Sequence, residues 1–346
     1  MPSPTISLPP IVFGATNLGN LFCEISRDEK LAIVKAWLAS PFDPCVIDSA
    51  GKYGAGLSLE TIGKTLASLD VAPERVVVSN KLGWRRTELT SSEPKFEPGV
   101  WKGIKHDAIQ DISYDGILRC WEEGDQLLGD YSAQLLSVHD PDEFLAAAVN
   151  DDADYDVARQ ERLTAIIDAY RALSELKRGG RASALGVGSK TWQVVRELSD
   201  HCDFDWVMLA NSFTILNHPP ELVGFLNQLH SAGIRVINSA LFHGGFLLGG
   251  DFLDYQAIDP SIERHAAALK WRDTFSKLCK QYDVSPFDAG VAFGQSHPAV
   301  SSIALSSSRA DRVSSHIAAA ETELPSEFWK AMIDHRLIDP SYPHLA

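Results

Sequence analysis

Short, nearly continuous hydrophobic runs recur along the chain and predict β-strands. Several of them, such as Val76–Val78, lack polar alternation, which is typical of strands buried on both faces. The predicted strands are Pro10–Ala15, Cys45–Ser49, Arg75–Asn80, Gln134–His139, Ala184–Ser189, Trp206–Phe213, Arg235–Ala240 and Val300–Ser306.

Between these runs, hydrophobic residues return every three or four positions, which predicts amphipathic helices. The clearest helical segments are Leu59–Leu69, Leu163–Leu176, Glu221–Leu229 and His265–Tyr282. Strands that alternate evenly with helices, without a linker, predict an α/β chain folded as one closed parallel (β/α)8 TIM barrel over residues 1–346. A large doubly wound sheet is the alternative.

Two long stretches interrupt this rhythm, Leu82–Ser113 after the third strand and the acidic Asp140–Asp156 after the fourth. Both leave the carboxyl ends of strands, where barrel enzymes build their active sites. Trp84 and Trp101 in the first stretch are predicted to form an aromatic wall for a substrate. Packing of that loop against the barrel is the alternative.

The formal net charge of −15 argues against nucleic-acid binding, although an anionic cofactor can still bind through a few local donors. The five cysteines are not closely spaced, which predicts free thiols and a cytoplasmic protein. We expect no signal peptide and no membrane association, because no hydrophobic run approaches the ~20 residues of a membrane span. No metal-binding or acyl-transfer motif is present, so we expect no metal.

Three polar residues end predicted buried strands: Asp48, Lys81 and His139. A barrel brings such strand ends to one rim, and Tyr53 lies in a glycine-rich loop after Asp48. A nearby ammonium stabilises a phenolate and lowers the pKa of tyrosine from its usual ~10, while a carboxylate keeps the lysine charged. The group predicts that Tyr53 transfers a proton in a reversible carbonyl–alcohol reaction, with His139 orienting the oxygen. Taken singly, each residue has a structural alternative: an ion pair, a supporting histidine or a loop aromatic.

The segment Val46–Gly54 resembles the DTAxxYG signature of the aldo-keto reductases, and Lys81 and His139 complete that family's group of four. The resemblance extends over nearly the whole chain and implies a barrel that binds a nicotinamide dinucleotide across its mouth, without a Rossmann fold. Segments Ala184–Ser189, Leu209–Leu216 and Phe242–Leu247 are similar to the aldose 1-dehydrogenase branch.

The same resemblance implies the cofactor contacts. Ser189 corresponds to a carboxamide contact, and Ser239 replaces an aromatic residue that often stacks on nicotinamide. The remaining positions, which hold the adenosine phosphates and the adenine, are Ser306, Ser308, Arg312 and His316. A strand leading into a helix N-cap is the alternative for this serine-rich end.

Ser308 stands where family members commonly carry a cation for the 2′-phosphate, which favours NAD over NADP. Arg309 and Arg312 lie nearby and keep NADP open. The leading function is oxidation of a free, fucose-like aldose at its anomeric carbon to the lactone. The alternatives are a pyridoxal or other small-aldehyde oxidoreductase and, from another class, a nucleotide-binding regulatory barrel without turnover. The oligomeric state is left open.

Overall fold

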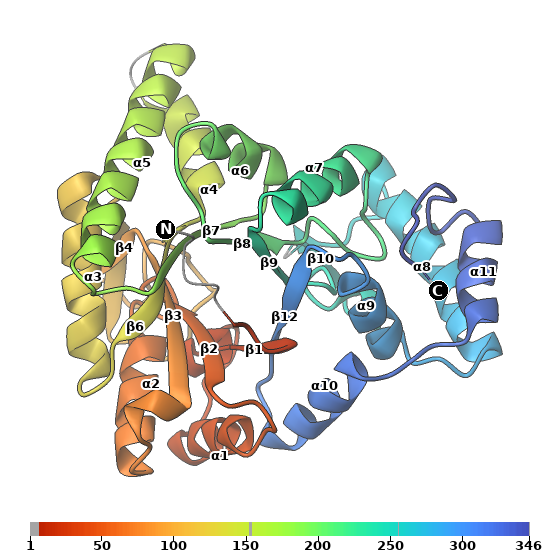
Figure 1. Ribbon diagram of the computed structural model, residues 1–346, viewed down its shortest axis with the longest axis horizontal. Coiled ribbons are helices and arrows are strands. Elements are labelled where there is room, and N and C mark those ends of the chain that lie inside the picture. The colour runs from red at the N-terminus through yellow and green to blue at the C-terminus, as the bar shows by residue number, and fades with distance from the viewer. Residues whose placement is uncertain (1–6, 152–153, 255, 346) are drawn as a thin grey trace.

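Eight parallel strands close into a barrel in chain order in the computed structural model, which describes residues 7–151, 154–254 and 256–345 (Figure 1). This confirms the predicted (β/α)8 fold. The barrel strands are β1 (Ile11–Gly14), β2 (Cys45–Ala50), β3 (Val76–Leu82), β6 (Ala133–His139), β7 (Ala184–Ser189), β8 (Trp206–Ala210), β9 (Arg235–Ser239) and β12 (Val300–Ser306).

Helices surround this barrel, and the four helical segments predicted above correspond to the helices Leu57–Ser68, Tyr155–Arg178, Pro220–Ser231 and Glu263–Gln281 (Figure 1). The outer helices are α1 (Arg27–Leu38), α2 (Leu57–Ser68), α3 (Tyr114–Leu128), α5 (Tyr155–Arg178), α6 (Trp192–Ser199), α7 (Pro220–Ser231), α8 (Glu263–Gln281), α9 (Pro286–Gly294), α10 (Val313–Ala320) and α11 (Ser326–Asp334).

One predicted strand is too long. The hydrophobic run was expected to continue to Phe213, but β8 ends at Ala210. Asn211 adopts a φ of 55°, in the left-handed region, which an extended strand cannot include. The backbone therefore turns away from the barrel wall at the rim.

Side chains fill the inside of the barrel over its amino-terminal half. A small hydrophobic cluster fills it, made of Val12, Val46, Leu135, Ala184, Trp206, Met208 and Ile237. The Trp206 indole packs against Gly186, where an added Cβ would lie only 2.3 Å from the ring. Only glycine fits that position, and the packed layer forms a floor beneath the carboxyl ends of the strands.

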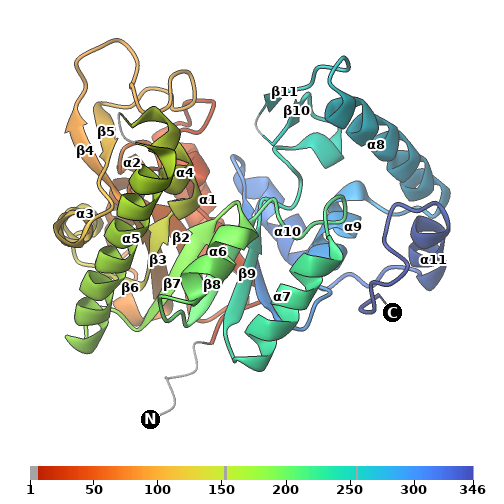
Figure 2. The same ribbon diagram turned by 90° about the horizontal axis from the view of Figure 1, so that it is seen from above.

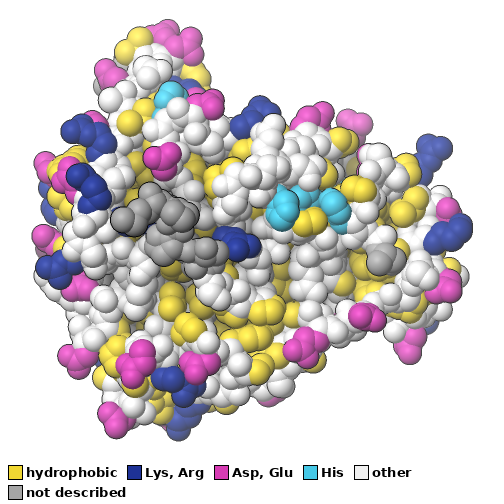
Figure 3. Space-filling model, in the orientation of Figure 1, with side chains coloured by type: hydrophobic (Ala, Val, Ile, Leu, Met, Phe, Trp, Pro, Cys, Tyr) yellow, Lys and Arg dark blue, Asp and Glu magenta, His cyan; other side chains and the backbone are white. Residues whose placement is uncertain are grey.

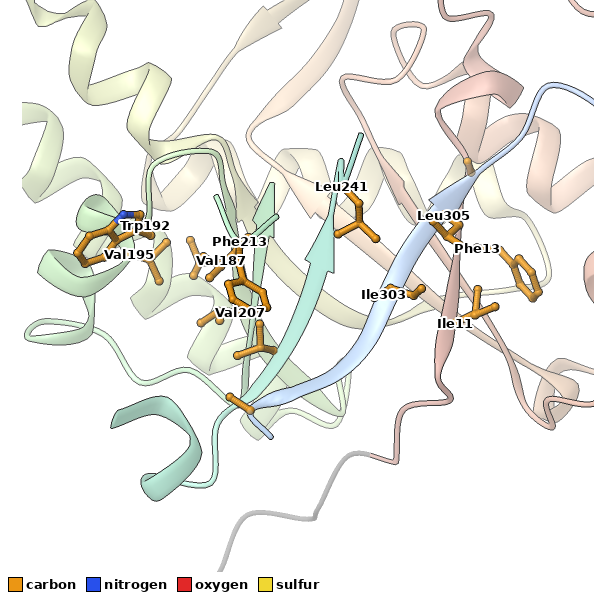
Figure 4. Close-up of a cluster of buried hydrophobic side chains, with 14 of the residues drawn as sticks. Ile11, Phe13, Val187, Trp192, Val195, Val207, Phe213, Leu241, Ile303 and Leu305 are labelled. Carbon is orange, nitrogen blue, oxygen red and sulfur yellow. The ribbon is translucent and has the colours of Figure 1, made fainter. Parts of the chain in front are cut away.

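The larger core lies between the barrel and the helices. Ile11 and Phe13 on β1, and Ile303 and Leu305 on the neighbouring β12, belong to it (Figure 4). The Phe13 ring stacks on Trp37 of α1, with centroids 5.6 Å apart and planes inclined by 14°. Alternate strand residues thus hold the helices in place and leave the opposite face free to point into the barrel.

The two irregular stretches contain secondary structure that the sequence did not reveal. The first folds into an antiparallel hairpin of β4 (Trp84–Glu88) and β5 (His106–Gln110). The second contains α4 (Pro141–Ala146) and the 3₁₀ turn η3 (Ala147–Asn150).

A third long insertion, residues 240–262, follows β9 and was not foreseen. It contains the 3₁₀ turn η4 (Phe246–Leu248) and the two-residue strands β10 (Phe252–Leu253) and β11 (Gln256–Ala257). The β4–β5 hairpin and the β10–β11 pair stand on the same end of the barrel, at opposite sides (Figure 2). Both insertions therefore flank the carboxyl ends of the strands.

On the face shown in Figure 3, Lys and Arg side chains are scattered among acidic ones, mostly along the edge. Within the part of the chain that the structure describes, no helix is long and hydrophobic enough to cross a membrane. The five cysteines are free.

Candidate active site

A cavity of about 1380 Å³ is formed where the barrel strands end. Its walls include the last residues of several strands, from Gly14 on β1 to Ser306 on β12. Its lining includes Asp48, Tyr53, Lys81 and His139, and also residues at the start of α10. This volume exceeds that of a typical drug-sized pocket and suits an extended ligand together with a smaller one.

Asp48 and Lys81 form a buried ion pair across neighbouring strands. The Lys81 ammonium contacts Asp48 Oδ2 and also donates to the backbone oxygen of Ser49 at 3.2 Å. The Ser79 hydroxyl donates to the other Asp48 oxygen at 3.0 Å. Gly188 makes room for the lysine, because an added Cβ there would lie 2.9 Å from Lys81 Cδ. The pair is thus almost completely buried and is hydrogen-bonded, which buried charges require.

Tyr53 lies over this ion pair. The Lys81 ammonium is 4.7 Å from the centroid of the Tyr53 ring, and the ring meets His139 edge-on, with centroids 5.5 Å apart. The loop that carries it packs against the turn after β1, where a Cβ on Gly54 would lie 2.4 Å from the Gly19 oxygen. Gly54 also has a φ of 63°, so glycine is needed here twice over. The structure brings all four predicted residues together.

His139 is held neutral. Burial, and then the positive charges of Lys81, Lys52 and Lys190, place the pKa of His139 well below its usual value. Its Nδ1 makes no hydrogen bond within the described residues. A neutral imidazole has one donor and one acceptor nitrogen, so His139 can form a directed hydrogen bond to a substrate oxygen without carrying charge.

The six residues predicted to contact a cofactor all line the same cavity: Ser189, Ser239, Ser306, Ser308, Arg312 and His316. Three of their hydroxyls already have partners in the protein. The hydroxyl of Ser239 donates to the Leu209 backbone oxygen at 3.2 Å, and that of Ser306 lies 2.9 Å from the Thr16 hydroxyl. The Ser189 hydroxyl accepts from a backbone N–H at 3.1 Å.

The end of the cavity next to α10 combines a cation with an aromatic pair. His316 stacks on Phe287, with centroids 5.0 Å apart and planes inclined by 23°. Burial and the charge of Arg312 lower the pKa of His316 to about 4, so its ring is neutral. Arg312 makes no ion pair with any described residue, although the chain is strongly acidic overall. An unpaired guanidinium beside stacked rings fits the phosphates and the base of a dinucleotide.

Arg309 does not take part in the cavity. It forms a two-point ion pair with Asp311. The serines do not cap the following helical turn η5 (Ala310–Arg312), as the N-cap alternative requires. Instead, the carboxylate of Glu29 on α1 accepts from the Ala310 N–H at 2.9 Å.

Of the two predicted substrate residues, only Trp101 lines the cavity. Its ring centroid lies 5.9 Å from that of Tyr53, and its indole N–H donates to Glu97. Trp84 is not part of the cavity wall: its ring packs on Phe96 at 5.7 Å, with the Lys52 ammonium 5.2 Å from the ring. The aromatic wall therefore consists of Trp101, and Trp84 is connected to it through Phe96, which packs on both rings.

Sequence reasoning missed a group of charged residues in the same wall: Lys52, Glu97, Asp140, Glu143 and Lys190. Two of them adjoin predicted residues, since Lys52 precedes Tyr53 and Asp140 follows His139. Charged residues in loops have no hydrophobic periodicity, so only this adjacency could have drawn attention to them. No group of acidic, histidine or cysteine side chains suited to a metal occurs in the described ranges.

A closed parallel barrel with a deep cavity at its carboxyl ends defines the class of (β/α)8 barrel proteins. The chain belongs to the aldo/keto reductase family, whose sequence profile matches residues 10–336. It is therefore an oxidoreductase of a family that works with a nicotinamide cofactor.

Two characterised relatives cover nearly the whole chain. A pyridoxal 4-dehydrogenase from Microbacterium luteolum is 28% identical over 335 residues, 94% of this chain and 93% of the relative. A D-threo-aldose 1-dehydrogenase from a Pseudomonas species is 25% identical over 350 residues, 96% of this chain and 95% of the relative. Among solved structures, a glycerol dehydrogenase from Gluconobacter oxydans has the same fold, with a TM-score of 0.67, 19% identity and coverage of 99% and 98%.

Proposed function

We propose that the protein oxidises a free, fucose-like aldose at its anomeric carbon and releases the lactone. The observation that carries this proposal is the buried Asp48–Lys81 ion pair beneath Tyr53, beside a neutral His139, in one cavity. The similarity to a D-threo-aldose 1-dehydrogenase supports the choice of substrate class.

Each residue of this group has a defined role in the proposal. Tyr53 accepts the proton of the anomeric hydroxyl as general base. The ammonium of Lys81 stabilises the phenolate, and Asp48 keeps that ammonium charged and in place. His139, being neutral, orients the sugar hydroxyl by a hydrogen bond. When bound, the nicotinamide cofactor supplies the acceptor for the hydride that leaves the anomeric carbon.

We assign the cofactor to the remaining part of the cavity, held by Ser189, Ser239, Ser306, Ser308, Arg312 and His316, and favour NAD over NADP. Two features near the adenosine end oppose the extra phosphate of NADP. Arg309 is paired with Asp311, and Glu29 places a carboxylate at the first N–H of η5. Of Arg309 and Arg312, only Arg312 lines the cavity.

A pyridoxal or other small aldehyde is the second candidate substrate. It is favoured by the pyridoxal 4-dehydrogenase relative and by the aromatic face of Trp101 in the wall. A regulatory barrel without turnover is disfavoured, because a pure binding protein has no need for a buried ion pair beneath a tyrosine. The free thiols are consistent with a cytoplasmic protein.

The test is an assay of the purified protein with a panel of aldoses and with pyridoxal, following reduced-cofactor absorbance with NAD and NADP separately. The proposal expects oxidation of at least one free pentose or hexose, with kcat/KM for NAD at least equal to that for NADP. Oxidation of pyridoxal alone would move the assignment to the second candidate. Cofactor binding without turnover of any substrate would refute both.

A further inference from the structure

Lys52 is a buried ammonium surrounded by three carboxylates. Its Nζ lies 3.3 Å from Asp140, 3.0 Å from Glu143 and 3.0 Å from Glu97. Burial alone would lower the pKa of Lys52, but the carboxylates outweigh it and raise that pKa above its usual value. An ammonium has three N–H groups, so Lys52 has no hydrogen left for a ligand.

Lys190 provides the second ammonium, and it is more open. It follows β7, and its Nζ contacts Glu143 and, at 3.4 Å, Asp140. Its side chain is 36% exposed and borders the cavity. These two carboxylates use two of its three N–H groups, and no third acceptor is found among the described residues. One donor therefore remains for a ligand.

Glu143 on α4 is the matching acceptor. One of its oxygens contacts Lys52 and the other contacts Lys190, while 40% of the side chain remains exposed. Each carboxylate oxygen can accept more than one hydrogen bond. A free N–H of Lys190 and free lone pairs of Glu143 thus lie side by side in the cavity wall. A hydroxyl group can accept from the first and donate to the second, and two neighbouring hydroxyls can use both at once.

The position of these side chains ties them to the reacting centre. Lys52 directly precedes Tyr53, and Asp140 directly follows His139. Asp140 has a φ of 48°, in the left-handed region that aspartate tolerates better than most residues with a side chain. Its carboxylate contacts both lysines and so holds the two ammonium groups together.

The net charge of the group selects against anions. Two ammonium groups and three carboxylates leave one negative charge on Lys52, Lys190, Asp140, Glu143 and Glu97 together. A phosphate or carboxylate substituent would be repelled, and a hydrocarbon would remove water from charged groups without replacing its hydrogen bonds. Neutral hydroxyl groups carry no charge that would be repelled, and they can replace the hydrogen bonds of the displaced water.

We propose that Lys190 and Glu143 form a specificity subsite for two neighbouring hydroxyl groups of a neutral polyhydroxylated substrate, on carbons close to the reacting one. This inference rests on the proposed function. Lys52 and Asp140 act as positioning residues, since they hold the two binding side chains at the edge of the cavity.

The experiment compares the wild type and a double variant, each with an aldose and with analogues that lack one hydroxyl group. The double variant Lys190→Met/Glu143→Met removes one charge of each sign, keeps the net charge and leaves neither a donor nor an acceptor for a hydroxyl group. Both enzymes are assayed with the best aldose and with its 2-deoxy and 3-deoxy analogues. For the wild type, loss of a recognised hydroxyl lowers kcat/KM by about 10–100-fold, mostly through KM. For the double variant, the same loss changes kcat/KM by less than about 3-fold.

A matched control and a folding check complete the design. Glu197→Gln breaks the Arg159–Glu197 ion pair outside the cavity and should leave the discrimination between sugar and deoxy-sugar unchanged. Thermal unfolding and the cofactor KM of each variant are measured in parallel.

Equal discrimination by the wild type and the double variant would overturn the subsite while leaving the proposed function intact. A raised cofactor KM with an unchanged sugar KM would also overturn it, because the cluster would then serve the cofactor. Failure of the wild type to oxidise any aldose would refute the proposed function, and the subsite with it.

Discussion

Lys81 can remain charged inside the barrel only because its neighbours replace the water that it has lost. Asp48 supplies the counter-charge, and the Ser49 backbone oxygen accepts a second hydrogen bond. A buried ion pair of this kind adds little stability in general, and removal of one partner leaves the other charge uncompensated. We infer that the pair is retained for its effect on Tyr53, whose ring lies against the ammonium.

Replacing Lys81 by Met should therefore shift the pH–rate profile of sugar oxidation to higher pH and lower turnover at pH 7 by about 10²-fold or more. Without the ammonium, the phenolate form of Tyr53 becomes harder to reach. Lys64→Met is the control, because Lys64 is an exposed lysine paired with Glu60 on α2. An unchanged profile with activity retained would mean that Lys81 is only a structural ion-pair residue.

The position of Asp48 and His139 at the cavity could be predicted because they continue the alternation of inward-facing residues along their strands. Val46 and Leu135 belong to the hydrophobic cluster inside the barrel, and residues two and four positions further on face the same way. Asp48 and His139 fall on those positions, so polar residues there had to face the cavity. Lys190 follows no such pattern, because it lies beyond the end of its strand.

The contact between the helix α1 and the turn η5 brings together segments that are far apart in the chain. Glu29 lies in the first turn of α1, and its carboxylate reaches the Ala310 N–H. The N-terminus of a helical turn attracts anions, and here a carboxylate of the protein already occupies that position. A cofactor phosphate placed nearby would be repelled by it.

The variant Glu29→Gln should therefore raise kcat/KM for NADP relative to NAD by up to about tenfold, or ~1.4 kcal/mol. Glutamine keeps the acceptor oxygen for the Ala310 N–H and removes only the charge. The measurement is the ratio of kcat/KM for the two cofactors at one saturating sugar concentration. If this ratio stays at its wild-type value, Glu29 has no part in cofactor choice.

Elements of the barrel could be predicted because their hydrophobic pattern is local, whereas the rim insertions lack one. The β4 strand, Trp84–Glu88, contains four consecutive polar or charged residues, and it pairs with β5 across a long connection. No tight turn marks such a hairpin. The insertion after β9 forms strands of two residues, too short for any periodicity to appear.

Several histidines in different parts of the molecule are buried in neutral form. Burial lowers the pKa of His297 and of His316 to about 4, and the pKa values of His139 and His218 also lie below their usual range. The unfolded chain takes up protons at these groups below pH ~6.5, which the folded protein cannot do until lower pH. The free energy of unfolding must therefore fall as the pH drops from ~6.5 towards 4.

We expect the melting temperature to fall by roughly 5–10 °C between pH 7 and pH 5. His297→Asn should reduce this loss, because an amide oxygen can replace Nδ1 as acceptor for the Ala299 N–H and does not titrate. Calorimetric scans of both proteins at a series of pH values provide the test. A pH-independent melting temperature would show that these histidines titrate normally in the folded protein.

Tyr53→Phe tests most directly whether Tyr53 transfers the proton in a nicotinamide-dependent oxidation. Phenylalanine keeps the ring between His139 and Trp101 and removes only the hydroxyl. Tyr131→Phe, which removes a hydroxyl bonded to a backbone oxygen elsewhere, is the control. The proposed role of Tyr53 predicts a loss of turnover of about 10²–10⁴-fold with an unchanged cofactor dissociation constant, measured by single-turnover kinetics and fluorescence titration. Turnover of folded Tyr53→Phe equal to that of the wild type would contradict it.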